Sequence, residues 1–164
     1  MVIFRSSGKG FTIVELLIVI VVIAILATVT IVAFNGVQSR ARDSKRAQDI
    51  STIKKAILSY DVINSGVSNT WTYNPNYNSP GRGGWDASTD AEWLAFLRPQ
   101  HGNMPVDPTN TLVNNTVFTG SKAYFYYCYP TGAGPLPASP NVRLIYYKDN
   151  GTLTSDSFAV SACL

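Results

Sequence analysis

The clearest candidate for chemistry in this sequence is Glu15, a carboxylate at the start of a long apolar run. After Glu15 the next charged residue is Arg40, and the apolar residues between them cover every face of a helix. About 20 such residues at 1.5 Å each span the hydrocarbon of a bilayer, so the run predicts a transmembrane helix. An ionisable group costs about 3 kcal/mol at the bilayer centre, so Glu15 marks a candidate functional site that needs a partner.

The residues around Glu15 form a motif. The sequence reads Gly10-Phe11-Thr12-Ile13-Val14-Glu15-Leu16-Leu17, behind a short basic leader and ahead of the apolar run. This motif resembles the processing signal of type IV prepilins and type II secretion pseudopilins. The resemblance implies that a prepilin peptidase cuts between Gly10 and Phe11 and then N-methylates Phe11. It also implies that Glu15 contacts the amino group of Phe11 on a neighbouring subunit during filament assembly.

Electrostatics independently favours a pair between Glu15 and an amino group. A free ammonium on Phe11 and a free carboxylate on Glu15 are each costly near hydrocarbon, and together they form a charge-assisted contact that strengthens as water leaves. The alternative is a capping box, Thr12-x-x-Glu15, in which the carboxylate accepts hydrogen bonds from the first amides of the helix. The two roles are compatible, but capping does not explain the glycine and phenylalanine that precede Thr12.

The resemblance implies a structural protein, not an enzyme. A type IV pilin polymerises through its N-terminal helix into a homo-oligomeric extracellular filament for adhesion, twitching motility or DNA uptake. Before assembly it is a precursor in the inner membrane, where an assembly platform receives it. Two alternatives stay open: a pseudopilin of a type II secretion or competence system, and a single-span membrane-anchored binding protein that does not polymerise.

Composition and motifs elsewhere indicate no enzyme. The 164 residues allow one membrane helix and one small globular domain. Removing Arg5 and Lys9 of the leader from the 13 basic residues leaves 11 against 10 acidic residues, so the charge says little about a nucleic-acid partner, and DNA is possible but unsupported. His101 has no nucleophile or base at a recognisable spacing, and the glycines at 81–84 do not precede a helix.

The two cysteines, Cys128 and Cys163, predict a disulfide if the domain lies outside the cytoplasm. Closing a loop of about 36 residues would stabilise the fold by about 3–4 kcal/mol. Two cysteines so far apart and a single histidine supply too few ligands for zinc.

The segment Met104 to Pro108 predicts a turn with a second resemblance. Its Pro-x-Asp-Pro pattern is similar to major pseudopilins, where nearby oxygen ligands can hold calcium. Here Asp107 and Asn110, with Asn114 and Asn115 beyond them, are the candidate ligands, and the density of carboxylates is low for calcium. We therefore expect an Asp-Pro turn without an ion and no cofactor, with calcium as the alternative.

The basic group Arg40, Arg42, Lys45 and Arg46 follows the apolar run. Counted alone, it would place the C-terminal domain in the cytoplasm. The processing signal and the cysteine pair indicate the opposite orientation, which we follow. We expect the group to form a solvated helix face, with i,i+4 and i,i+3 pairs to Asp49 and Asp43. Contacts to lipid head groups, to acidic patches of neighbouring subunits or to DNA are the functional alternatives.

These patterns predict an α+β fold in which a long N-terminal helix packs against a C-terminal antiparallel sheet, a lollipop shape. The expected parts are a cleaved leader 1–10, a transmembrane and assembly helix 11–36 and a head 37–164. Within the head we expect an amphipathic helix 37–64, an aromatic loop 67–88, a short helix 90–98 that Pro99 ends, and a sheet 123–164. The apolar stripe of the amphipathic helix is Ala47, Ile50, Ile53, Ile57, Tyr60 and Asn64. The expected strands are 123–129, 142–147 and 158–164, with a hairpin turn at Asn150-Gly151.

Overall fold

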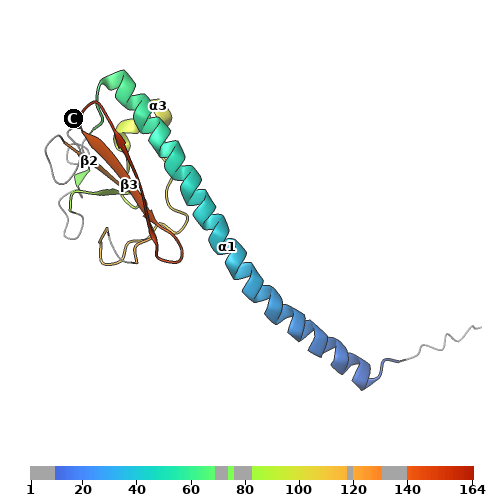
Figure 1. Cartoon of the computed structure of the whole chain (residues 1–164). Helices are drawn as coiled ribbons and strands as arrows, with labels where there is room; N and C mark the ends of the chain where they lie inside the picture. Colours follow the sequence, from blue (N-terminus) through green and yellow to red (C-terminus); the bar gives the residue numbers. More distant parts are fainter. Residues whose placement is uncertain (1–9, 69–73, 76–82, 118–119, 131–139) are drawn as a thin grey trace, which may run out of the picture. The chain divides into compact units, whose positions relative to one another are not determined.

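The fold is taken from a computed structural model, which describes residues 10–68, 74–75, 83–117, 120–130 and 140–164. Its elements are helix α1 (Ile13–Asn64), strand β1 (Asp86–Ala87), the 3-10 helix η2 (Ala95–Leu97), helix α3 (Arg98–His101) and strands β2 (Phe125–Tyr129), β3 (Asn141–Tyr147) and β4 (Leu153–Ala159) (Figure 1). The chain divides into two compact units, Met1–Arg40 and Ala41–Leu164. We call the second unit the head.

The N-terminal unit contains the apolar part of α1, coloured blue in Figure 1. Among the described residues, α1 contains the one stretch that is long and apolar enough to cross a membrane. The hydroxyls of Thr28 and Thr30 donate to the carbonyls of Ile25 and Leu26, each at 2.8 Å. Both hydroxyls are therefore satisfied within the helix and need no water in a bilayer.

The four strands of the head form one antiparallel sheet in the order β1-β2-β3-β4. In its centre Tyr126 of β2 lies opposite Leu144 of β3, and Leu144 lies opposite Asp156 of β4. Figure 1 shows the head part of α1 running alongside this sheet. The predicted α+β fold, a long N-terminal helix with a C-terminal antiparallel sheet, is confirmed.

Each face of the sheet buries its own set of side chains, because successive residues of a strand point to opposite faces. Residues of β2 and β3 on one face join Ile53 and Ile57 of α1 in a core; they are Tyr126, Cys128, Val142, Leu144 and Tyr146. On the other face Phe125 and Ile145 pack with Trp85 and Ala87. Strands β2 and β3 are thus covered on both faces, whereas alternate residues of β4 are exposed.

The buried stripe of α1 differs from the predicted one. Ile50, Ile53 and Ile57 are buried as predicted, but Ala47 and Asn64 are exposed. In their place the buried face includes three charged residues, which are Arg46, Asp49 and Asp61. Hydropathy assigns charged residues to the solvent, so the pattern could not place them inside.

The turn between β3 and β4 is the predicted one, but the last strand is not. The amide of Lys148 donates to the carbonyl of Thr152 at 2.9 Å, and Gly151 has φ +84°, which glycine adopts without strain. Strand β4 begins directly after this turn and ends at Ala159, so the prediction of a strand at 158–164 is wrong. The chain leaves the sheet there because residues 160–164 turn toward the end of α1.

The predicted helix at 90–98 is also replaced by a different structure. Leu94 takes a left-handed conformation (φ 44°, ψ 40°), and its amide donates to the Asp86 carboxylate at 2.9 Å. The residues before Leu94 form turns, and the helical turns η2 and α3 follow it. Pro99 lies in the first turn of α3, where a missing amide is tolerated, and does not end the helix. Trp93, Leu94 and Leu97 are nevertheless buried, as the sequence predicts.

The aromatic loop packs on the head where the structure describes it. Trp85 is buried, and its ring lies 5.5 Å from that of Tyr127 and 6.4 Å from that of Tyr129. Trp71, Tyr73 and Tyr77 of the predicted loop lie outside the described residues, as does most of the Pro/Gly-rich segment between β2 and β3.

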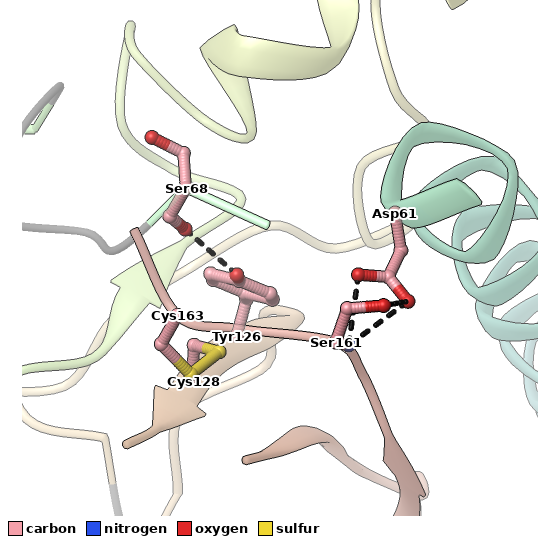
Figure 2. Close-up of a disulfide and its surroundings, with 6 residues drawn as sticks. All are labelled: Asp61, Ser68, Tyr126, Cys128, Ser161 and Cys163. Carbon is pink, nitrogen blue, oxygen red and sulfur yellow. Dashed lines mark hydrogen bonds between the residues drawn. A yellow bond between two sulfur atoms is a disulfide. The ribbon is translucent and has the colours of Figure 1, made fainter. Parts of the chain in front are cut away.

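The predicted disulfide between Cys128 and Cys163 is present (Figure 2). It joins β2 to the end of the chain, and Cys163 also forms a parallel bridge with Val67, just after α1. Asp61 of α1 accepts hydrogen bonds from the amide of Ser161 at 2.9 and 3.1 Å. The C-terminal segment is therefore tied both to the sheet and to the last turns of α1.

Candidate functional site

The predicted capping box is present at the start of α1. The amide and the hydroxyl of Thr12 both donate to Oε2 of Glu15, each at 2.8 Å. The amide of Glu15 donates in return to the Thr12 hydroxyl oxygen at 3.2 Å. These contacts satisfy amides that have no partner within the helix. They also hold the Glu15 carboxylate against Thr12, next to Phe11 in the sequence.

The residues before the helix are accessible. Phe11 is 85% exposed, and Gly10 is also exposed and precedes the first helical residue, Ile13. A Cβ atom added at Gly10 would meet no heavy atom within 4 Å, and the backbone there has no positive φ. Nothing in the fold of the described residues therefore requires a glycine at position 10.

Residues 5–31 match the family model described as the prokaryotic N-terminal methylation motif. The chain carries this motif. The match includes Gly10, Phe11 and Glu15 and extends through most of the apolar part of α1, so the motif and the exposed helix are one continuous feature.

A relative of known name is the type II secretion system core protein G of Klebsiella michiganensis. It is 33% identical over 66 residues, which are 40% of this chain and 46% of the relative. The chain therefore matches less than half the length of this relative. No solved structure matches the chain.

The basic group that follows the methylation motif is the second candidate site, and the structure brings it together with Asp107. Arg46 is fully buried, so the prediction of a solvated face is wrong for this residue. Its guanidinium contacts Asp107 through Nε at 2.7 Å and Nη2 at 3.1 Å, and its Nη1 contacts Asp43 at 2.8 Å and Asp149 at 2.6 Å. Nη2 also lies 3.3 Å from the Thr109 hydroxyl. We call Arg46, Asp43, Asp107 and Asp149 the Arg46 cluster.

Charges in the Arg46 cluster stabilise one another. Burial alone would lower the pKa of Arg46, but its hydrogen bonds to Asp107 and Asp149 outweigh burial and raise that pKa. Hydrogen bonding by Arg42, and the hydrogen bond from Arg46, lower the pKa of Asp149 from 3.8 to about 2, against the opposing effect of burial. Arg46 and Asp149 are therefore both ionised at neutral pH.

The other basic residues also have acidic neighbours. Arg42 donates to Asp149 through Nε at 2.7 Å, and Lys45 forms the predicted i,i+4 pair with Asp49. The second carboxylate oxygen of Asp49 accepts a hydrogen bond from the buried Tyr124 hydroxyl at 2.8 Å. Aspartates therefore pair with Arg42, Lys45 and Arg46, three of the four residues of the basic group.

Asp107 and Asn110, the candidate calcium ligands, are occupied by other groups. Both carboxylate oxygens of Asp107 accept hydrogen bonds from Arg46, and Oδ1 also accepts from the amide of Thr109 at 2.8 Å. The amide oxygen of Asn110 accepts from the Ser88 hydroxyl at 2.7 Å. Within the described part of the chain, no three His, Cys, Asp or Glu side chains are grouped so that they could hold a metal ion.

Sequence reasoning missed the role of Asp149 and Asp61. Asp149 lies beside the Asn150-Gly151 turn, and Asp61 lies in the predicted amphipathic helix, so each has an unremarkable local setting. For the Arg46 cluster, the one signal in the sequence was the i,i+3 spacing of Asp43 and Arg46. That spacing predicted their contact, which is confirmed at 2.8 Å.

Proposed function

We propose that this chain is a filament subunit of the pilin type, processed at Gly10 and polymerised through the apolar part of α1. The observation that carries the proposal is an exposed apolar helix that begins within the methylation motif and continues beyond it. Exposed apolar surface costs about 25 cal/mol per Å² in water. The helix therefore needs lipid around it before assembly and the helices of neighbouring subunits afterwards.

The geometry at Gly10 supports cleavage at this position. The fold makes no demand for glycine there, so the glycine of the motif serves a molecule that approaches the backbone closely. A prepilin peptidase is such a molecule, and the exposed junction between Gly10 and Phe11 would be open to it. The cut would give Phe11 a free amino group, which the same enzyme would methylate.

Glu15 would then pair with the amino group of Phe11 on a neighbouring subunit. In the single chain its carboxylate is exposed, and the two hydrogen bonds from Thr12 reach the same oxygen, Oε2. A neighbouring ammonium would form a charge-assisted contact with this carboxylate as lipid and water leave the interface.

We propose a type IV pilus as the filament, and a specific observation supports a pseudopilus as the second candidate. The similarity to a type II secretion system core protein G, together with the Pro-x-Asp-Pro turn, favours a pseudopilus. In both cases the precursor would lie in the cytoplasmic membrane with its head outside the cytoplasm. The Cys128–Cys163 disulfide supports that location, because disulfides persist in oxidising compartments.

Mass spectrometry of the mature N-terminus tests the proposal. We expect a chain that begins at Phe11 and carries one N-methyl group when a prepilin peptidase is present, and an uncut chain in its absence. Gly10→Val should retain the leader, whereas the control Gly8→Val, a glycine outside the cut junction, should be processed normally. A wild-type chain that keeps Met1, or that is cut at another position, would refute the proposal.

A further inference from the structure

The Arg46 cluster joins three segments that are distant in the sequence. Arg46 and Asp43 lie on α1, Asp107 lies in the Pro-x-Asp-Pro turn 61 residues after Arg46, and Asp149 lies beside the β3–β4 turn 103 residues after it. The side chains of Arg46 and Asp107 are both fully buried, and that of Asp149 is 14% exposed. A single guanidinium therefore connects the helix, the turn and the edge hairpin of the sheet.

The cluster is almost fully satisfied by its own hydrogen bonds. Four contacts between Arg46 and carboxylate oxygens have lengths of 2.6 to 3.1 Å, and Asp107 receives two of them in the parallel arrangement that suits a guanidinium. Asp43 Oδ1 also accepts from the amide of Asp149 at 3.0 Å, which fixes the hairpin against α1.

A calcium ion at Asp107 does not fit this arrangement. Calcium takes about six to eight oxygen ligands at about 2.3–2.6 Å. The two oxygens of Asp107 are already directed at Arg46, and the amide oxygen of Asn110 is directed at Ser88. A divalent ion placed against Asp107 would also lie beside the positive charge of Arg46 in a buried setting, where like charges repel strongly.

We propose that Arg46 is the built-in cation of the Pro-x-Asp-Pro turn, and that the head folds without a divalent metal at Asp107. The guanidinium supplies the positive charge that holds the turn and the hairpin against α1. The inference concerns the stability of the head alone, so it stands or fails independently of whether the chain forms filaments.

The first experiment compares the full chain in detergent micelles with excess chelator and with excess calcium. Thermal unfolding of the head, followed by near-UV circular dichroism, should have the same midpoint in both solutions. A midpoint that falls with chelator and recovers with calcium in the wild-type chain, but not in Asp107→Asn, would overturn the proposal.

The second experiment removes the cation. Arg46→Gln should be cleaved about 100-fold faster by a protease that attacks the unfolded head, because breaking a buried pair leaves its carboxylates without a partner. Lys55→Gln is the matched control, since Lys55 is exposed on the same helix, and it should resist proteolysis like the wild type. Equal resistance of Arg46→Gln and Lys55→Gln would overturn the proposal.

A third variant addresses the case in which Arg46→Gln fails to accumulate. Arg46→Lys keeps the charge but loses the planar fork, so it should have a protease resistance between those of Arg46→Gln and the wild type. Calcium should not change the resistance of Arg46→Lys. A lysine chain that becomes calcium-dependent, or that equals the wild type, would show that the guanidinium is not the required cation.

Discussion

Glu15 and Arg46 are charged residues of the same helix, and different kinds of partner stabilise their charges. The carboxylate of Glu15 accepts hydrogen bonds from Thr12, three residues before it. Arg46 contacts carboxylates that lie 61 and 103 residues further along the chain, as well as Asp43 nearby. A local partner leaves the Glu15 carboxylate accessible from outside, whereas the distant partners enclose Arg46 completely.

Two substitutions at the start of α1 separate capping from assembly. Glu15→Ala should abolish filaments while the protein stays in the membrane, because the partner of the Phe11 amine is lost. Thr12→Ala should weaken the helix start by about 1 kcal/mol but should still assemble, because it keeps the carboxylate. Immunoblots of sheared filaments and of membranes measure both. Abundant filaments from Glu15→Ala, or an equal defect in Thr12→Ala, would contradict the assembly role.

The lowered pKa of Asp149 predicts that the head loses stability in acid. The pKa of Asp149 in the folded state, about 2, is below its ordinary value of 3.8, so its ion pairs stabilise the fold above pH 4. That stabilisation should be lost as the pH falls from about 4 to about 2, by at most about 2 kcal/mol and less after screening by solvent. Denaturant unfolding at several pH values measures the loss. Asp149→Asn should be less stable at neutral pH and should lack this part of the pH dependence.

At the scale of elements, α1 changes its environment along its length. Its first part is exposed and apolar, while in the head it buries one face against the sheet. Lys54 extends the contact to β4, where its Nζ lies 3.0 Å from Asp156 and 5.1 Å from the centre of the Phe158 ring. The helix therefore needs an apolar surface for its first part and a specific set of partners for its second.

The buried face of α1 predicts a large loss for a single truncation. Ile53 has no exposed surface and packs in the core between α1 and the sheet. Ile53→Ala should lower the free energy of unfolding by about 2–5 kcal/mol through lost burial and a residual cavity. Ile63→Ala is the matched control, because Ile63 is on the same helix and 64% exposed. Equal unfolding midpoints in denaturant for the two variants would contradict this packing.

At the scale of the whole molecule, covalent and non-covalent ties hold the C-terminal end to the head. The disulfide joins Cys163 to β2, and the amide of Leu164 donates to the carbonyl of Val67 at 2.7 Å. Gly66 permits this close approach, since a Cβ atom there would come within 2.8 Å of the Leu164 side chain. These contacts hold the C-terminal residues between β2 and the residues that follow α1.

Replacing both cysteines by serine should destabilise the head. The disulfide spans a sequence separation of 35, and its loss should lower the free energy of unfolding by about 3–4 kcal/mol. Limited proteolysis of the oxidised wild type, the reduced wild type and the double variant measures the effect. Equal protease resistance of all three would show that the bond adds no stability.

The place where the mature chain accumulates distinguishes a type IV pilin from a pseudopilin. If the chain is a type IV pilin, sheared surface filaments should contain it as the bulk component. A pseudopilin would remain with the cell envelope at its natural expression level. Immunoblots of the sheared and envelope fractions distinguish the two, with a cytoplasmic protein as the control for lysis.

The features that a few residues determine by themselves were predictable from the sequence. The apolar run implied the exposed first part of α1, the Thr12-x-x-Glu15 spacing implied the cap, and Asn150-Gly151 implied the hairpin turn. The cysteine pair and the alternating strands implied the disulfide and the sheet. In each case the physical cause is either a backbone preference or a covalent possibility that only a few residues determine.

The features that depend on distant partners were decided by the tertiary structure alone. Helical spacing cannot show that Arg46 is buried, because its burial is favourable only when Asp107 and Asp149 reach it. Leu94 leaves the helical conformation because its amide meets Asp86, and β4 ends at Ala159 because the chain then returns to α1. The sequence by itself determined the long apolar helix with its methylation motif and the α+β class of the head. Which charges lie inside the head depended on groups that only folding brings within hydrogen-bonding distance.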